Sequence, residues 1–388
     1  MLMESRWLKS NADRLLIGCL GLFLCIILIL TADFSHIAPE QALTVANGRI
    51  VRVVTEVLRQ DLYIPTLEIG SQIVEVEVLS GEFAGERIEI VHQLTRFHNF
   101  HLADGDAILV GMIPGILELT PYTVSVYGPA RGPTLMITLI ILAIGLLVVG
   151  RLKGLYALVS LIFTFVVIIY FLVHGIVAGV SPVGLAIISS LLIITFTTGM
   201  ISGVTKESLA AVGGALFGLL AAGIASLILG QFTRISGINL EGARQVLYHT
   251  PLGTTIRIQD LFFAVIIIAT TGAMIDSSIS IASSAFELKA QSKKINWRQL
   301  YQSSMQVARS VLGANVNTLI LAFAGTSLVT LLLIVLFGFA PLRIINLELV
   351  AIEIVLAASA TLGMLVGIPV TALFASYLAT QQKRGEKR

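Results

Sequence analysis

Long apolar runs recur along most of the chain, and a single segment of more polar composition separates the first run from the others. Runs of about 20 apolar residues are long enough to cross a lipid bilayer as helices. Eight such spans are predicted, at Leu15–Thr31, Leu135–Val149, Leu155–His174, Val183–Met200, Leu209–Leu229, Leu261–Ile281, Val311–Phe339 and Leu349–Tyr377. The pattern therefore predicts a polytopic α-helical membrane protein with about eight transmembrane helices.

A pattern of period two fills the segment between the first two predicted spans. Residues 74–78 (VEVEV) and 87–91 (RIEIV) alternate apolar and polar side chains on either side of a loop that contains Gly81 and Gly85. Such alternation predicts a β-hairpin. Further short strands are predicted at Ile50–Val54, Ala107–Val110 and Thr123–Tyr127. Several short strands in so small a segment favour a β-rich domain outside the membrane, either an OB-like barrel or a compact sandwich.

These patterns divide the chain into four parts. They are a cytoplasmic N-terminus with a signal-anchor helix (1–36), an extracytoplasmic β-rich domain (37–131), a seven-helix transmembrane bundle (132–380) and a basic cytoplasmic tail (381–388). Within the bundle, apolar residues at helical spacing lie beside basic residues near 295–310. That segment is predicted to be an amphipathic helix on the membrane surface.

Composition and charge agree with a membrane protein. Hydrophobic residues make up 56% of the chain and charged residues 12%, against roughly 25% charged residues in ordinary globular domains. A net charge of +2 is too small to favour nucleic acid as a partner. Lysine and arginine flank the spans mainly on one side, which predicts that both termini are cytoplasmic. Arg234, Arg244 and Arg257 fall on the other side, so seven spans remain the alternative.

The sequence offers little support for a metal, a cofactor or enzymatic chemistry. Both cysteines, Cys19 and Cys25, lie in the first apolar run, which favours neither a disulfide framework nor a cysteine metal site. His92, His98 and His101 lie near residues 104–106 (DGD), but that tripeptide is typical of a turn before a strand. No metal site and no cofactor are therefore predicted. Nucleotide-binding loops, HExxH and nucleophile elbows are absent from the sequence, so we do not expect an enzyme.

An acid stands inside the apolar run Leu261–Ile281. At 1.5 Å per residue, Asp276 lies about 22 Å along the helix, past the middle of a hydrocarbon core about 30 Å thick. A central aspartate costs roughly 2.5–3.5 kcal/mol, so it should face protein or water rather than lipid. The same helix face carries Ser280, Ser283, Ser284 and Glu287. The pattern predicts a polar pathway centred on Asp276, and helix packing through the serines is the alternative.

Further polar residues at a similar depth are predicted to line the same pathway. Asn315, Asn317 and Thr318 occur early in the seventh span, and Glu353 occurs in the eighth. A capped helix N-terminus is the alternative for the asparagines, and an interfacial helix start is the alternative for Glu353. Asp276 and Glu353 are expected to be too far apart to touch.

Small residues in the fifth and eighth spans predict helix contacts rather than a site. They are Gly214, Gly218 and Ala222 in the fifth span, and Gly363, Gly367 and Pro369 in the eighth. The proline also predicts a kink.

Three motifs carry a family resemblance. Residues 272–276 (GAMID), followed by Ser280-Ile281, Ser283 and Glu287-Leu288, resemble the YibE/F-like family of bacterial membrane proteins. Residues 313–319 (GANVNTL) are similar to the family's second signature, with Ala314 and Asn315 where the family has threonine and methionine. Residues 368–372 (IPVTA) are similar to its C-terminal signature. The resemblance implies one span, an external β-rich domain and a multi-span bundle, but names no substrate.

Three functions are compatible with these observations. The leading hypothesis is a transporter or permease, coupled to a proton or cation gradient through Asp276, that moves an unidentified small solute or ion across the lipid bilayer. The second is an envelope accessory or scaffold protein whose domain 37–131 binds a protein partner. The third, a membrane enzyme acting on lipid-linked substrates, has only the two intramembrane acids in its favour and ranks last.

Overall fold

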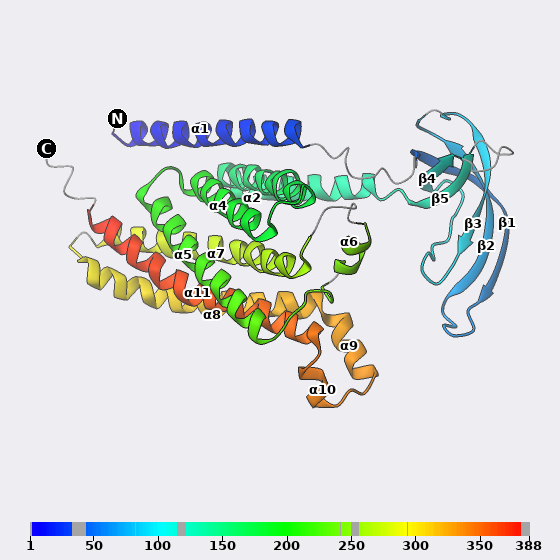
Figure 1. The fold of residues 1–388 in the computed structure, drawn as a ribbon. Helices are drawn as coiled ribbons and strands as arrows, with labels where there is room; N and C mark the ends of the chain where they lie inside the picture. Colours follow the sequence, from blue (N-terminus) through cyan, green and yellow to red (C-terminus); the bar gives the residue numbers. More distant parts are fainter. Residues whose placement is uncertain are drawn as a thin grey trace. The chain divides into compact units, whose positions relative to one another are not determined.

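The computed structural model describes residues 2–32, 44–81, 83–114, 122–240, 242–249, 256–292 and 294–381. The chain is mostly helical and divides into two compact units. One comprises residues 35–145, with a β domain, and the other comprises residues 1–34 and 146–388, with the helical bundle (Figure 1). Each unit has its own hydrophobic core.

The β domain is one antiparallel sheet of five strands, in the order β3-β2-β1-β4-β5. The strands are β1 (Thr44–Gln60), β2 (Glu68–Val78), β3 (Arg87–Leu94), β4 (Ala107–Pro114) and β5 (Tyr122–Pro129). β1 pairs with β4 from Thr44 to Arg49 and with β2 from Gly48 to Gln60. Register shifts between Ile50 and Thr55 mark irregularities that bend such a strand. The predicted β-rich domain is confirmed, and each predicted strand lies within an observed one.

Alternation along the strands builds the core of this domain. Val74, Val76 and Val78 are fully buried, whereas Glu75 and Glu77 between them remain partly exposed. Ile108 and Val110 of β4 complete the buried layer. Burying each such side chain contributes roughly 1.5–3 kcal/mol. The period-two pattern therefore favours a sheet, because pairing of the strands removes the apolar face of the sheet from water.

The described residues contain seven helical segments long and apolar enough to cross a membrane. The helices of the chain are α1 (Leu2–Thr31), α2 (Gly132–Val166), the π-helix η1 (Val167–Val173), α3 (His174–Val177), α4 (Pro182–Ser202), α5 (Lys206–Phe232), α6 (Ala243–His249), α7 (Ile258–Gln291), α8 (Trp297–Thr326), α9 (Leu328–Leu336), α10 (Pro341–Ile345) and α11 (Glu348–Thr380). α2, η1 and α3 follow one another directly and form one segment, Gly132–Val177, of 46 residues.

This long segment contains a sharp turn. A straight helix of that length would measure about 70 Å, more than twice the thickness of a hydrocarbon core of about 30 Å. Arg151 interrupts it with non-helical angles, φ 50° and ψ −129°. A Cβ added to Gly154 would lie 2.8 Å from the carbonyl carbon of Leu146, so the chain folds back on itself at this point. The turn falls between the predicted second and third spans.

The predicted surface helix near 295–310 is not a separate element. α8 begins at Trp297, where the Asn296 side chain accepts a hydrogen bond from the Gln299 backbone N–H at 2.9 Å. It then continues without a break to Thr326. The predicted seventh span is divided instead at Ser327, between α8 and α9.

Three helices, α5, α7 and α11, form the centre of the bundle (Figure 1). Glycines allow this close approach: a Cβ on Gly363 of α11 would lie 2.7 Å from the carbonyl oxygen of Gly218 on α5. It would also lie 2.8 Å from the Cβ of Ala222. Fully buried Met274 of α7 fills the space beside these glycines. The small residues of the fifth and eighth predicted spans therefore pack against each other.

Candidate functional site

Asp276, in the middle of α7, lines a cleft of about 370 Å³. The walls come from α2, η1, α4 and α7. The hydroxyl-bearing residues in the lining are Ser160, Thr164, Thr197 and Thr271, and most of the others are aliphatic. Asp276 is the only ionisable residue among those lining residues. An acid with several hydroxyls in an otherwise apolar cleft can bind a cation or a proton, or hold water.

The predicted polar stripe lies on one side of α7. Asp276, Ser280, Ser283 and Glu287 are exposed in the isolated chain, and Ser284 is half-buried. Their spacing places them on one face because α7 is helical from Ile258 to Gln291. The Ser284 hydroxyl donates to the Ser280 carbonyl at 2.8 Å, so it is satisfied within its own helix. Of the other stripe hydroxyls, that of Ser280 is exposed to an outside partner or to water.

Glu207 joins this stripe from another helix. It lies in the first turn of α5, with its carboxylate close to the side chains of Ser283 on α7 and Ser202 on α4. Lys153 and Arg14 are near enough to act on it electrostatically. Sequence reasoning missed Glu207, because an acid in the first turn of a helix is already explained by the helix dipole.

The side chain of Arg14, on α1, also lies near Glu207. Its Nη2 donates to the carbonyl of Ile201 at 3.2 Å, and its guanidinium carbon lies 5.0 Å from the centre of the Tyr156 ring. Ile201 also lines the Asp276 cleft. We call the group of Arg14, Lys153, Ser202, Glu207 and Ser283 the charged cluster. It lies about two helical turns beyond Asp276 along α7.

The asparagines predicted to line the pathway divide between two roles. Asn315 of α8 donates its Nδ2 hydrogen to Ser277 Oγ at 2.7 Å, and Ser277 is buried. Asn317 and Thr318 are exposed, and the Thr318 hydroxyl donates to the Ala314 carbonyl at 3.0 Å. None of the three lines the Asp276 cleft. The structure therefore brings Asn315 to α7 but not to Asp276.

Glu353 lies in a separate pocket of about 240 Å³ between α8, α9 and α11. That pocket is lined largely by apolar side chains, including Phe323 and Ile334, and shares no lining residue with the Asp276 cleft. Glu353 and Asp276 therefore belong to different places in the bundle.

Hydroxyls on the buried side of α7 serve helix packing. Thr271 donates to Ser190 Oγ of α4 at 2.7 Å, and the Ser278 and Thr371 hydroxyls are 3.2 Å apart, which joins α7 to α11. Helix packing was the alternative role considered for the serines of the stripe. The hydroxyls that join α7 to its neighbours belong instead to Thr271 and Ser278, which are not in the predicted stripe.

Two of the histidines of the β domain, His92 and His101, make local side-chain contacts. His92 is buried, with Nε2 2.9 Å from the Phe100 carbonyl oxygen, and burial lowers its pKa. His101 Nε2 lies 3.3 Å from a Glu68 carboxylate oxygen. Within the described ranges, no group of three or more His, Cys, Asp or Glu residues could hold a metal ion.

The fold and the cleft define a class of protein: a bundle of helices apolar enough to cross a membrane, with an acid in a cleft and a separate β domain. Within this class, residues 138–381 match the model of the YibE/F-like protein family. The match covers more than half of the chain and includes Asp276 and the C-terminal signature, so the chain belongs to this family. No curated protein and no solved structure matches it.

Proposed function

We propose that this protein is a transporter or permease of the bacterial cell (inner) membrane, and that its substrate, a small solute or ion, passes along the Asp276 cleft. One observation carries the proposal: an acid and four hydroxyl-bearing residues line a cleft of about 370 Å³ between apolar helices. Intramembrane acids are costly, and they commonly serve ion and proton pathways. Asp276 would bind the coupling proton or cation.

The proposed topology has eight spans and cytoplasmic termini. We count the two sides of the turn at Arg151 as separate spans, which raises the count from seven to eight. Arg14 and Lys153 then lie at the cytoplasmic surface, as the positive-inside rule requires. The charged cluster would form the cytoplasmic end of the pathway.

We also propose that the β domain is an OB-like barrel. β1 pairs with both β2 and β4, and the two edge strands β3 and β5 contact each other. A five-stranded sheet that curls until its edges meet is the arrangement of that fold.

Cysteine accessibility tests the pathway. Single cysteines would replace Gly272 and Ser280 in a protein whose Cys19 and Cys25 are changed to alanine. The matched control is Leu220→Cys, because Leu220 is 56% exposed but lies on an apolar face of α5. A membrane-impermeant thiol reagent should label positions 272 and 280 in native membranes but not position 220. If positions 272 and 280 react as poorly as position 220, the cleft is dry and the pathway is wrong.

A second candidate function follows from the separate β domain. This domain has its own core and contributes nothing to the Asp276 cleft. As an envelope accessory or scaffold protein, the chain would bind a protein partner through residues 37–131. A partner that co-purifies with the full chain, but not with a variant lacking those residues, would support this function over transport.

A further inference from the structure

The β domain carries three large apolar side chains that are almost entirely exposed. Leu62 is 94% exposed, Tyr63 is 80% exposed and Phe97 is 94% exposed. Leu62 and Tyr63 lie in the turn between β1 and β2, and Phe97 lies just after β3. We call these three residues the apolar tip. Exposing so much apolar surface at loop ends is unfavourable in water and commonly marks a binding surface.

An ion pair between a half-exposed arginine and a buried aspartate joins the two loops of the apolar tip. The Asp61 side chain is fully buried and accepts hydrogen bonds from Arg96, with Nε 2.6 Å from Oδ2 and Nη2 3.2 Å from Oδ1. Asp61 Oδ1 also accepts from the backbone N–H groups of Tyr63 at 2.7 Å and Ile64 at 2.9 Å. The Arg96 guanidinium carbon lies 4.8 Å from the centre of the Tyr63 ring. The loops are therefore ordered before binding, which lowers the entropy cost of an interaction.

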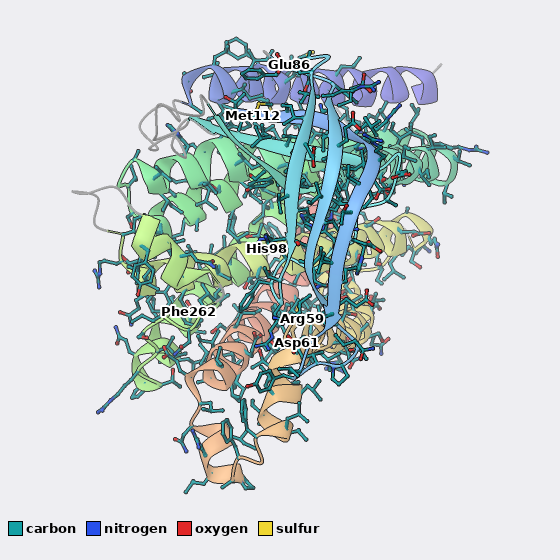
Figure 2. All side chains as sticks on the ribbon, turned by 90° about the vertical axis from the view of Figure 1, so that its right-hand side faces the viewer. Arg59, Asp61, Glu86, His98, Met112 and Phe262 are labelled. Atoms are coloured by element: carbon teal, nitrogen blue, oxygen red, sulfur yellow. The ribbon has the colours of Figure 1, made fainter. Side chains whose placement is uncertain are left out.

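Two arginine side chains flank the apolar tip. Arg59 is exposed at the end of β1, and the Arg96 side chain is 47% exposed. The neighbouring acids are engaged, since Asp61 pairs with Arg96 and Glu68 lies beside His101. Figure 2 shows Arg59 and Asp61 together at one end of the sheet, with Glu86 at the opposite end.

We propose that the apolar tip inserts into the headgroup region of the bilayer that the same chain crosses, and that it favours anionic lipid. Leucine and aromatic side chains beside arginine are the residues that bind membrane interfaces. A projecting tip suits a deformable lipid surface, whereas a protein partner would need a matching pocket. Both ends of the domain lead into predicted spans, so the bilayer is always present at a high effective concentration. This inference does not depend on the proposed transport function.

Tryptophan quenching in the full chain tests the inference. The two native tryptophans, Trp7 and Trp297, would be replaced by phenylalanine, and Leu62→Trp would be the single probe. Glu86→Trp, at the opposite end of the sheet, is the matched control. The variants would be reconstituted in nanodiscs whose lipids are brominated on the acyl chains, with either phosphatidylglycerol or only phosphatidylcholine. Unchanged circular dichroism would establish that each variant folds.

The expected result is strong quenching of the tryptophan at position 62 and little quenching at position 86. Quenching should be greater with phosphatidylglycerol, and Arg59→Gln should reduce that difference. Equal quenching at the two positions would overturn the inference. So would an unquenched tryptophan at position 62 whose neighbourhood crosslinks to another protein or to a second copy of this chain, because the tip would then be a protein-binding surface.

Discussion

The amide of Asn315 donates a hydrogen bond to the hydroxyl of Ser277, with Nδ2 2.7 Å from Oγ, and this bond joins α8 to α7. The Ser277 hydroxyl in turn donates a hydrogen bond to the Ala273 backbone carbonyl at 2.8 Å. Asn315→Leu should therefore lower stability by about 0.6 kcal/mol, and by no more than about 1.7 kcal/mol, the range for interhelical hydrogen bonds in membranes. Thermal unfolding in detergent would measure the change. Asn317→Leu is the control, since Asn317 is exposed on the same helix; an equal loss from it would contradict the assignment.

Close packing between α5 and α11 makes Gly363 intolerant of a side chain. A Cβ at this position would lie 2.7 Å from the Gly218 carbonyl oxygen, which is a backbone atom that cannot rotate away. Gly363→Ala should therefore destabilise the bundle by about 1–3 kcal/mol. Gly223→Ala on α5 is the control, because nothing lies within 4 Å of its added Cβ. That change should be neutral or stabilising by up to about 1 kcal/mol through helix propensity. Denaturant titration in mixed micelles would compare the two.

We expect Asp276 to draw water into the cleft rather than to stabilise the fold. Its side chain is exposed in the isolated chain, and the cleft beside it is otherwise uncharged. Asp276→Leu should leave unfolding stability unchanged or raise it, since a costly charge is removed from an apolar region. The same change should slow thiol labelling of Gly272→Cys, whereas Asp276→Asn should slow it less because the amide still binds water. A large loss of stability in either variant would show that Asp276 is a structural residue.

Glu348 holds the loop after α5 against the start of α11. Its Oε1 accepts hydrogen bonds from the backbone N–H of Ser236 at 2.7 Å and of Gly237 at 3.1 Å, and Oε2 accepts from Asn239 Nδ2 at 2.6 Å. Glu348→Gln places an amide donor opposite some of these donors and should cost about 1–3 kcal/mol. Glu353→Gln is the matched control, because Glu353 lies in a mainly apolar pocket about one and a half turns further along α11. Equal effects on thermal unfolding would contradict the role given to Glu348.

The apolar tip should loosen in acid. The hydrogen bond from Arg96, together with those from Tyr63 and Ile64, holds the pKa of Asp61 below its usual range. Because the folded pKa is the lower one, this contribution to stability is complete above the unfolded pKa of about 3.9. It is lost as the pH falls from there through the folded pKa.

Hydrogen exchange in residues 61–67, corrected for intrinsic rates, should therefore accelerate as the pH falls through that window. Asp61→Asn should exchange faster at neutral pH and show a flatter dependence on pH. A variant that retains the wild-type acid response would show that another group controls the loop.

Local sequence patterns predicted the features that depend on a single helix or strand. Alternation in Val74–Val78 located β2 because a strand has one buried face, and the spacing from Asp276 to Glu287 located one exposed face of α7 because helix periodicity is fixed. The apolar runs located the helices, although α8 and α9 divide the predicted seventh span at Ser327. Hydropathy measures how apolar a segment is, so it does not indicate where an apolar helix is interrupted.

Contacts between distant helices could not be predicted in the same way. Glu207 and Arg14 reach the charged cluster only because α1, α4, α5 and α7 meet there, and neither residue is unusual in its own segment. Asn315 and Asn317 are two residues apart and equally polar, yet helical rotation turns one toward Ser277 and leaves the other exposed. Which neighbour covers which face is a property of the assembled bundle.

The length of β1 bears on how the protein is made. One edge of β1 is covered by β2, which follows directly in the chain, but the Thr44–Arg49 stretch waits for β4 at Ala107–Met112. During synthesis the β1–β2 hairpin therefore emerges with an unpaired edge, and unpaired edges recruit other strands. Conditions that slow synthesis of the segment between the hairpin and β4 should trap this half-made sheet. The nascent domain would then be most vulnerable to misassembly and proteolysis before its fourth strand arrives.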